Sequence, residues 1–254
     1  MTGLLMVWFS LTFLLCRRMN NYGIVDVVWS YAFTGVAWFY AFAGNGWSMR
    51  KLVLASLASA WSIRLGSHLY RRVMSHHPVE DSRYQQLRID WKDNFGTMMF
   101  GFFQLQALAV VVLSLPFLLP VHNAVTYFSH WEIVGTAICF LALCGESVAD
   151  GQLAAFRRKP ANKGQVCNVG LWHYSRHPNY FFEWCIWVGF GIFALGSVWG
   201  WIGLIAPASI YYLLRYKTGV PMAEESSLKS KGDLFREYQK TTNAFFPGTP
   251  RASS

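Results

Sequence analysis

A short stretch of the chain, from Arg176 to Glu183, gathers side chains that carry chemistry at the start of an apolar segment. A guanidinium, an imidazole, a carboxamide, a phenol and a carboxylate stand there, on Arg176, His177, Asn179, Tyr180 and Glu183. Such groups are costly beside lipid unless they face a partner or a water-filled cavity. The stretch therefore predicts a functional pocket. For His177, which precedes a proline, a role in capping or turning the chain is the alternative.

The loop before this stretch is rich in cations. Residues 157–159 read Arg-Arg-Lys and are followed by Pro160. Such a run, with glycine-containing turns and Arg176 after it, suits an anion with several negative charges, although a solvated basic loop is the alternative. Pro178 favours the start of a helix, whose free amides and positive dipole end would also attract a phosphate.

Further ionisable groups lie inside or at the ends of apolar runs, namely Asp26, Arg64, Glu146 and Asp150. Isolated charges in such places need partners, so we expect them to gather around one cavity. Arg215 and the pair Glu224-Glu225 follow the last apolar run and are expected near a ligand. The segment from Phe235 to Pro247 reads as an amphipathic tail on the membrane surface.

The composition indicates a membrane protein. Hydrophobic residues make up 54% of the chain and charged residues only 14%, against about 25% charged in an average soluble domain. The sequence predicts an all-α polytopic membrane protein with seven transmembrane helices in a single domain, residues 1–254. The expected spans run over residues 3–16, 24–43, 52–70, 95–119, 131–149, 180–195 and 198–216.

The distribution of basic residues predicts the orientation. With seven spans, one side of the membrane receives Arg17 and Arg18, the basic loops after residues 70 and 156, and the C-terminal tail. By the positive-inside rule this side is cytoplasmic, so we expect the N-terminus outside and the C-terminus inside. The first run could be the core of a signal peptide, but no basic residue precedes it and no cleavage site follows, so a helix is favoured.

Several classes of protein are not supported by the sequence. It contains no Walker loop, no H-E-x-x-H and no G-x-G-x-x-G after a strand, so a Rossmann domain is excluded. The five cysteines include no C-x-x-C pair and mostly lie in apolar helices, so they are expected to be small packing residues and neither a disulfide framework nor a metal site. Membrane lipids are the expected surroundings; no nucleic acid and no obligate protein partner are indicated.

The ordered set of motifs resembles the steroid 5-alpha-reductase family, and especially its bacterial membrane branch. The resemblance rests on Asp150, the Arg158-Lys159-Pro160 element, Gly170-Leu171, Asn179-Tyr180, Glu183, Arg215 and Phe235-x-x-Tyr238. It covers residues 61–247 and is strongest from Glu146 to Glu183. It implies a seven-helix membrane enzyme that uses NADPH to reduce the carbon–carbon double bond of 3-oxo-Δ4 steroids.

The resemblance also implies which residues take part. The cofactor-binding candidates are Arg64, Arg71, Asp150, Arg157, Arg158, Lys159, Arg176, His177, Asn179, Tyr180, Glu183, Arg215 and Glu224. The catalytic candidates are Asp26, Trp61 and Glu146. Two departures from the family stand out: Trp61 occupies the place of a catalytic Tyr and cannot donate a phenolic proton, and Phe182 stands where Gly is usual.

The expected chemistry is hydride addition to the β-carbon of an enone while negative charge builds on the ketone oxygen. An acid aimed at that oxygen in a water-poor pocket stabilises this charge. Asp26 or Glu146 would donate if buried and protonated, and Tyr31 is a further donor. A steroid-like substrate would enter from the bilayer, whereas NADPH would arrive at the cytoplasmic, basic face.

Two other functions compete with the reductase. One set of residues also resembles the cofactor-binding residues of membrane methyltransferases of the isoprenylcysteine carboxyl type, which use S-adenosylmethionine. The set consists of Arg176, His177, Tyr180 and Glu224-Glu225. The cations of residues 157–159 suit a dinucleotide with a 2′-phosphate better. A channel or transporter is less consistent with the sequence, because the polar groups gather at one end of the spans instead of lining their whole length.

Overall fold

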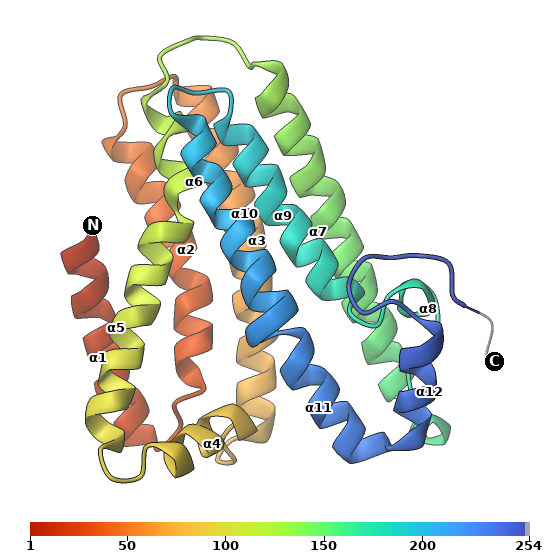
Figure 1. Cartoon of the computed structure of the whole chain (residues 1–254). Helices are drawn as coiled ribbons and strands as arrows, with labels where there is room; N and C mark the ends of the chain where they lie inside the picture. Colours follow the sequence, from red (N-terminus) through yellow and green to blue (C-terminus); the bar gives the residue numbers. More distant parts are fainter. Residues whose placement is uncertain (252–254) are drawn as a thin grey trace. The chain divides into compact units, whose positions relative to one another are not determined.

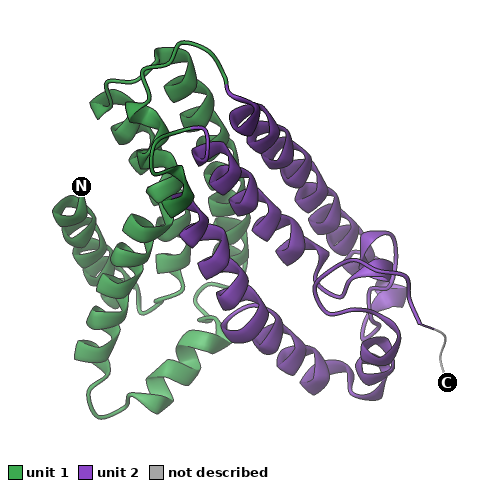
Figure 2. Cartoon of the chain, turned by 45° about the horizontal axis from the view of Figure 1, so that its top comes forward, with its two compact units in different colours: residues 1–128, 197–202 green, residues 129–196, 203–254 purple. Residues whose placement is uncertain are grey.

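The computed structural model describes residues 1–251, which form helices, turns and loops without any strand. The predicted all-α class is therefore confirmed. The chain forms two compact units: unit 1 holds residues 1–128 and 197–202, and unit 2 holds residues 129–196 and those from 203 onward (Figure 2). The expectation of one domain stays a prediction.

Unit 1 is built from two pairs of packed helices. Its helices are α1 (Thr2–Met19), α2 (Ile24–Ala43), α3 (Ser48–His76), α4 (Ser82–Asp90), α5 (Phe95–Leu113) and α6 (Leu115–Leu118), followed by the 3-10 turn η1 (Pro120–His122) (Figure 1). Helix α2 packs along α3, and α1 packs along α5. The hydroxyl of Ser62 donates to the carbonyl of Ser30 at 2.5 Å and accepts from Thr34 at 2.8 Å. Small polar residues thus join α2 to α3, as is common between membrane helices.

Unit 2 is organised around α7 and α9. Its helices are α7 (His130–Arg157), α8 (Leu171–Tyr174), α9 (Pro178–Ala194), α10 (Ile205–Tyr212), α11 (Val220–Lys231) and α12 (Asp233–Thr241), with the 3-10 turn η2 (Pro160–Asn162) and the π-helical turn η4 (Leu213–Lys217). A capping box of Ser129 and Glu132 begins α7. Helices α7 and α9 approach so closely that a Cβ atom at Gly135 would lie 2.5 Å from the backbone nitrogen of Phe193.

The membrane assignment rests on long apolar helices. Among the described residues, four helices are long and apolar enough to cross a bilayer: Thr2–Met19, Ile24–Ala43, Phe95–Leu118 and His130–Arg157. The predicted third span lies within α3, of 29 residues, and the predicted sixth span coincides with α9, of 17 residues, up to Ala194. The predicted seventh span is not one regular α-helix, because 3-10 (Gly200–Leu204), α and π segments succeed one another there.

Two segments differ from their expected places. The tail helix α12 buries Phe235 and Tyr238 in unit 2, and the Tyr238 hydroxyl donates to the carbonyl of Trp172. Its apolar face therefore packs on protein and not on a lipid surface. Arg50 precedes the expected span 52–70 but belongs to α3, where it is fully buried and donates to three loop carbonyls, those of Asn123, Val125 and Tyr127.

Candidate functional site

The start of α9 is fixed by an ion pair with α11. Arg176 donates through Nε to Oε1 of Glu224 at 2.8 Å, and its Nη2 lies 2.7 Å from the same oxygen. The side chains of Arg176 and Glu224 are only 10% and 15% exposed. Pro178 occupies the first turn of α9, as the sequence predicts. The polar residues before the helix are thus held against α11 by a nearly buried charge pair.

Two further side chains complete this cluster. Nε2 of His177 lies 3.2 Å from Oε1 of Glu224, and Nε2 of Gln239 donates to Oε2 at 2.7 Å. Burial by itself raises the pKa of Glu224, but the hydrogen bonds from His177 and Arg176 outweigh it and lower the pKa to about 2. Burial lowers the pKa of His177, although Glu224 opposes that shift. Glu224 is therefore a carboxylate at neutral pH.

Arg176 also ties down the C-terminal segment. Its Nη1 donates to the carbonyls of Gln239 and Thr242, and its backbone N–H donates to the carbonyl of Asn243 at 2.9 Å. The hydroxyl of Ser175 donates to the carbonyl of Phe245 at 2.8 Å. The guanidinium of Arg176 is thus engaged within the protein, where it positions the segment after α12 and presents no free fork to a phosphate.

The next residues of α9 present groups of a different kind. The ring of His177 stacks on Tyr180 with centroids 5.4 Å apart and planes 7° from parallel. Glu183 is buried and accepts a hydrogen bond from Nε1 of Trp187 at 3.0 Å. The carboxamide oxygen of Asn179 is buried and has no hydrogen-bond partner among the described residues. A buried, unpaired acceptor is costly, so Asn179 offers a place for a donor from a ligand.

A second feature of unit 2 is a pocket of about 380 Å³ at the end of α7. Five cations line this cation pocket: Arg157, Arg158, Lys159, Lys163 and Lys231. The apolar side chains of Leu153 and Phe156 also contribute to its walls, and none of the described lining residues is a carboxylate. The three consecutive cations that the sequence singled out therefore do share one pocket, and α11 adds a fifth cation to it.

Two other cofactor candidates of unit 2 lie apart from the lining of this pocket. Asp150 belongs to α7, about two turns before Arg157. Arg215 lies in the π-helical turn η4, with its guanidinium carbon 5.3 Å from the centroid of the Tyr216 ring. Irregular helical turns of this kind are often found at functional sites.

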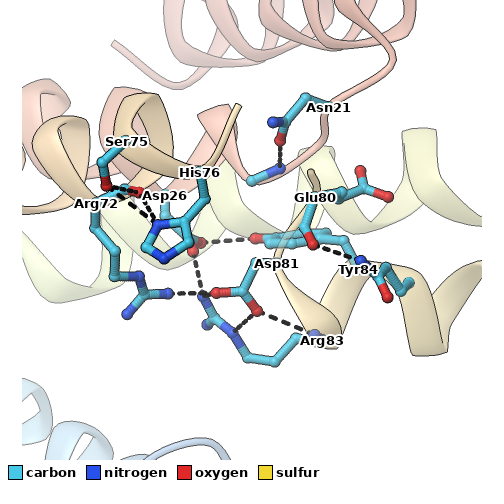
Figure 3. Close-up of polar contacts among 11 residues, drawn as sticks. Asn21, Asp26, Arg72, Ser75, His76, Glu80, Asp81, Arg83 and Tyr84 are labelled. Carbon is cyan, nitrogen blue, oxygen red and sulfur yellow. Dashed lines mark hydrogen bonds and ion pairs between the residues drawn. The ribbon is translucent and has the colours of Figure 1, made fainter. Parts of the chain in front are cut away.

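In unit 1, Asp26 belongs to a cluster of charged groups at the start of α2 (Figure 3). Its Oδ1 accepts a hydrogen bond from the hydroxyl of Tyr84 at 2.7 Å, and its Oδ2 accepts one from Nη2 of Arg83 at 2.7 Å. Arg83 also donates to Asp81, which pairs with Arg72 at 2.5 Å. Both oxygens of Asp26 thus act as acceptors.

The pKa values of two residues in this cluster, Asp81 and Tyr84, are shifted in opposite directions. Burial opposes ionisation of Asp81, yet the hydrogen bonds and charge of Arg83 prevail and lower its pKa to about 2. Burial, reinforced by the charge of Asp26, raises the pKa of Tyr84 well above its ordinary value. Tyr84 and Arg83 thus both donate to Asp26, which acts here as a hydrogen-bond acceptor, whereas the role suggested by the sequence is that of a donor.

The remaining candidates are divided between the units. Trp61 is fully buried on α3 and packs edge-on against Phe33, with centroids 5.2 Å apart. Arg64 and Arg71 lie further along α3, where Arg71 is exposed. Glu146 is buried on α7 in unit 2. The hydroxyl of Tyr31, the alternative donor, forms a hydrogen bond with the hydroxyl of Ser67 at 2.9 Å.

The structure adds functional candidates that the sequence did not single out. Lys231 and Gln239 lie in polar helices far along the chain from their neighbours in space, and no local signal marks them. Arg83 and Tyr84 lie in the short polar helix α4, outside the apolar spans that hold the other charged candidates. The only signal in the sequence for Arg83 and Tyr84 is indirect: a charged Asp26 at the end of an apolar span needs a partner from elsewhere in the chain.

Comparison with known proteins gives the following matches. The model of a family described as "Protein of unknown function (DUF1295)" matches residues 12–242. The chain is also similar to an uncharacterized protein of Schizosaccharomyces pombe, with 25% identity over 261 residues that cover 90% of this chain and 73% of the relative. No solved structure gives a significant match.

Proposed function

The chain belongs to the DUF1295 family, and we propose that it is a membrane enzyme that uses NADPH to reduce the C4–C5 double bond of 3-oxo-Δ4 steroids or similar lipophilic enones. The observation that carries the proposal is the cation pocket, with five cations and no carboxylate among its described lining residues. Such a pocket favours a ligand with several negative charges, as the phosphates of NADPH are.

The residues at the start of α9 also suit this cofactor. The buried oxygen of Asn179, which has no partner among the described residues, would accept a hydrogen bond from the carboxamide of a nicotinamide. Tyr180, whose ring stacks on the buried ring of His177, follows Asn179 in the chain and would contact the cofactor beside it. When bound, NADPH supplies the hydride that is added to the β-carbon of the enone. Arg176 and Glu224 would act by holding these residues in position.

We assign the role of carbonyl acid to Glu146 in preference to Asp26. A donor to the ketone oxygen must carry a proton, and Asp26 accepts hydrogen bonds from both Arg83 and Tyr84. Glu146 is buried on α7, in the same unit as the cation pocket and Asn179, and a carboxyl group there that carries a proton would donate to a developing oxyanion.

The proposed function includes a multi-pass topology. We place seven spans in the bilayer, with the N-terminus outside and the C-terminus and the cation pocket in the cytoplasm. The four long apolar helices support a membrane location, and the concentration of cations on one side supports the orientation. A lipophilic substrate would then enter from the bilayer, whereas the soluble cofactor would bind from the cytoplasm. Reporter fusions at the two termini test this topology.

One observation favours a second function, the S-adenosylmethionine-dependent methyltransferase. Arg176, His177 and Glu224, which resemble the cofactor-binding set of those enzymes, do lie together. However, S-adenosylmethionine carries a sulfonium cation and no phosphate, so it gives no reason for five cations in one pocket. We therefore prefer the reductase.

The test is the thermal stability of the detergent-purified protein with NADPH, NADP⁺, NADH or S-adenosylmethionine. At a hundredfold excess over its dissociation constant, a ligand of the folded state stabilises it by about 2.7 kcal/mol. Stabilisation by NADPH or NADP⁺, followed by consumption of NADPH with a 3-oxo-Δ4 steroid, is the expected result. Stabilisation by S-adenosylmethionine alone would contradict the reductase and support the methyltransferase.

A further inference from the structure

Lys231 is placed in the cation pocket by the end of a distant helix. It is the last residue of α11, and Gly232, with φ 53°, then turns the chain into α12. Lys231 is half-buried, and burial together with the charge of Arg157 lowers its pKa. Neither Lys231 nor Arg157 has an ion pair with a carboxylate among the described residues. An anion between these two cations would relieve their repulsion.

The lining of the pocket also distinguishes between two forms of a nucleotide. Sites that select a free ribose 2′-hydroxyl use a carboxylate to accept its hydrogen bond, whereas sites for a 2′-phosphate use cations. The described lining contains no carboxylate and has cations on three segments: the end of α7 with Lys159, the loop with Lys163, and α11 with Lys231. A phosphate monoester carries about two charges and three acceptor oxygens, so it can be held from several directions at once.

We infer that Lys231, together with Lys163, completes a subsite for the 2′-phosphate of the cofactor and makes the enzyme prefer NADPH to NADH. The inference rests on the proposed function, because it names the part of the cofactor that the cation pocket holds. It assigns to α11 a role in cofactor selection that no motif in the sequence indicates.

The alternative for Lys231 is a purely structural role. A lysine in the last turn of a helix interacts favourably with the helix dipole, whatever the ligand. Lys229 provides the matched control, because it lies in the same turn of α11 but is exposed and pairs with Glu225 at 2.7 Å. A dipole effect would be shared by both lysines, whereas contact with the 2′-phosphate belongs to Lys231 alone.

The experiment measures dissociation constants of the full-length protein in detergent for NADPH, NADH, 2′,5′-ADP and 5′-ADP. The variants are Lys231→Gln, Lys163→Gln and the control Lys229→Gln. For Lys231→Gln we expect NADPH and 2′,5′-ADP to bind on the order of tenfold more weakly, with NADH and 5′-ADP little changed, because a charged hydrogen bond to the phosphate is lost. Lys163→Gln should act in the same direction, and Lys229→Gln should match the wild type.

Three results would overturn the inference. The first is equal affinity of the wild type for NADPH and NADH, and the second is an equal loss for both nucleotides in Lys231→Gln. The third is that Lys231→Gln binds phosphatidylglycerol vesicles more weakly than the wild type while its dissociation constants for the nucleotides are unchanged. This result would make the pocket a lipid headgroup site. Enone reduction by either nucleotide would leave the reductase itself intact in the first two cases. If no nucleotide binds and S-adenosylmethionine does, the proposed function fails as well.

Discussion

Arg176 and Glu224 form a nearly buried ion pair across 48 residues of the chain, with both Nε and Nη2 of the arginine within 2.8 Å of Oε1 of the glutamate. The pair joins the residues before α9 to α11, and the same guanidinium holds the carbonyls of Gln239 and Thr242. A single side chain therefore connects three segments around the candidate site. We therefore expect removal of this side chain to lower the stability of unit 2 more than it affects the rate of any chemical step.

We predict that Arg176→Ala destabilises the protein by about 3 kcal/mol, because it leaves the buried carboxylate of Glu224 without its main partner. Thermal or denaturant unfolding of the purified protein measures the effect. Arg236→Ala is the matched control, since the side chains of Arg236 and Asp233 are 65% and 93% exposed and an exposed pair contributes little. Equal stability of the Arg176 variant and the wild type would contradict the structural role assigned to this pair.

The pKa of Glu224 predicts a dependence of stability on pH. Its pKa of about 2 in the folded protein lies below its ordinary value of 4.5. As the pH falls, the unfolded chain binds this proton first, so the stabilisation is complete above about pH 4.5 and is lost between about pH 4.5 and pH 2. Glu224→Gln should flatten the fall in stability over this range. An unchanged slope in the variant would mean that other carboxylates are responsible.

The hydrogen bond from Tyr84 to Asp26 predicts a second effect on stability. Tyr84→Phe removes one of the donors to a partly buried carboxylate, and we expect a loss of about 1–2 kcal/mol in the free energy of unfolding. Tyr127→Phe is the control, because that side chain is 68% exposed. A loss of enone reduction in Tyr84→Phe without any loss of stability would instead assign the phenol to the reaction.

The close approach of α7 and α9 makes Gly135 sensitive to any side chain. A Cβ atom there would lie 2.5–2.8 Å from backbone atoms of Gly189 and Phe193, which cannot move aside without shifting α9. We expect Gly135→Ala to destabilise by about 2 kcal/mol through overpacking. Gly151→Ala on the same helix meets nothing within 4 Å and should be neutral or slightly stabilising. Similar unfolding temperatures for the two variants would rule out this packing.

The assignment of Glu146 as the carbonyl acid predicts a change in turnover. With NADPH and a 3-oxo-Δ4 steroid, Glu146→Gln should lower kcat by about a hundredfold while cofactor binding stays intact, as for the loss of an oxyanion donor. Asp26→Asn should mainly reduce stability, because it breaks the pair with Arg83. Full turnover in Glu146→Gln, or a selective loss of kcat in Asp26→Asn, would return the role to Asp26.

Parts of the fold that depend on local sequence were predicted well. Four of the expected spans coincide with long apolar helices, and Pro178 begins α9 where it was expected. The expected seventh span was less well predicted, because the run of apolar residues gives no sign of the change from 3-10 to α and then π geometry. A run of apolar residues indicates burial, but it does not indicate how the backbone adjusts to neighbouring helices.

The sequence by itself determined that the chain is helical and rich in apolar helices, and that its cations gather near residues 157–159, since these features depend on neighbouring residues alone. Only the tertiary structure decided how individual charges are used. It engaged Arg176 within the protein, gave Asp26 the partners Arg83 and Tyr84, and brought Lys231 to the cation pocket. The physical reason is that a charge removed from water needs a partner, which the fold supplies for Arg176 and Asp26 and a ligand would supply for Lys231, and no local pattern says where that partner is.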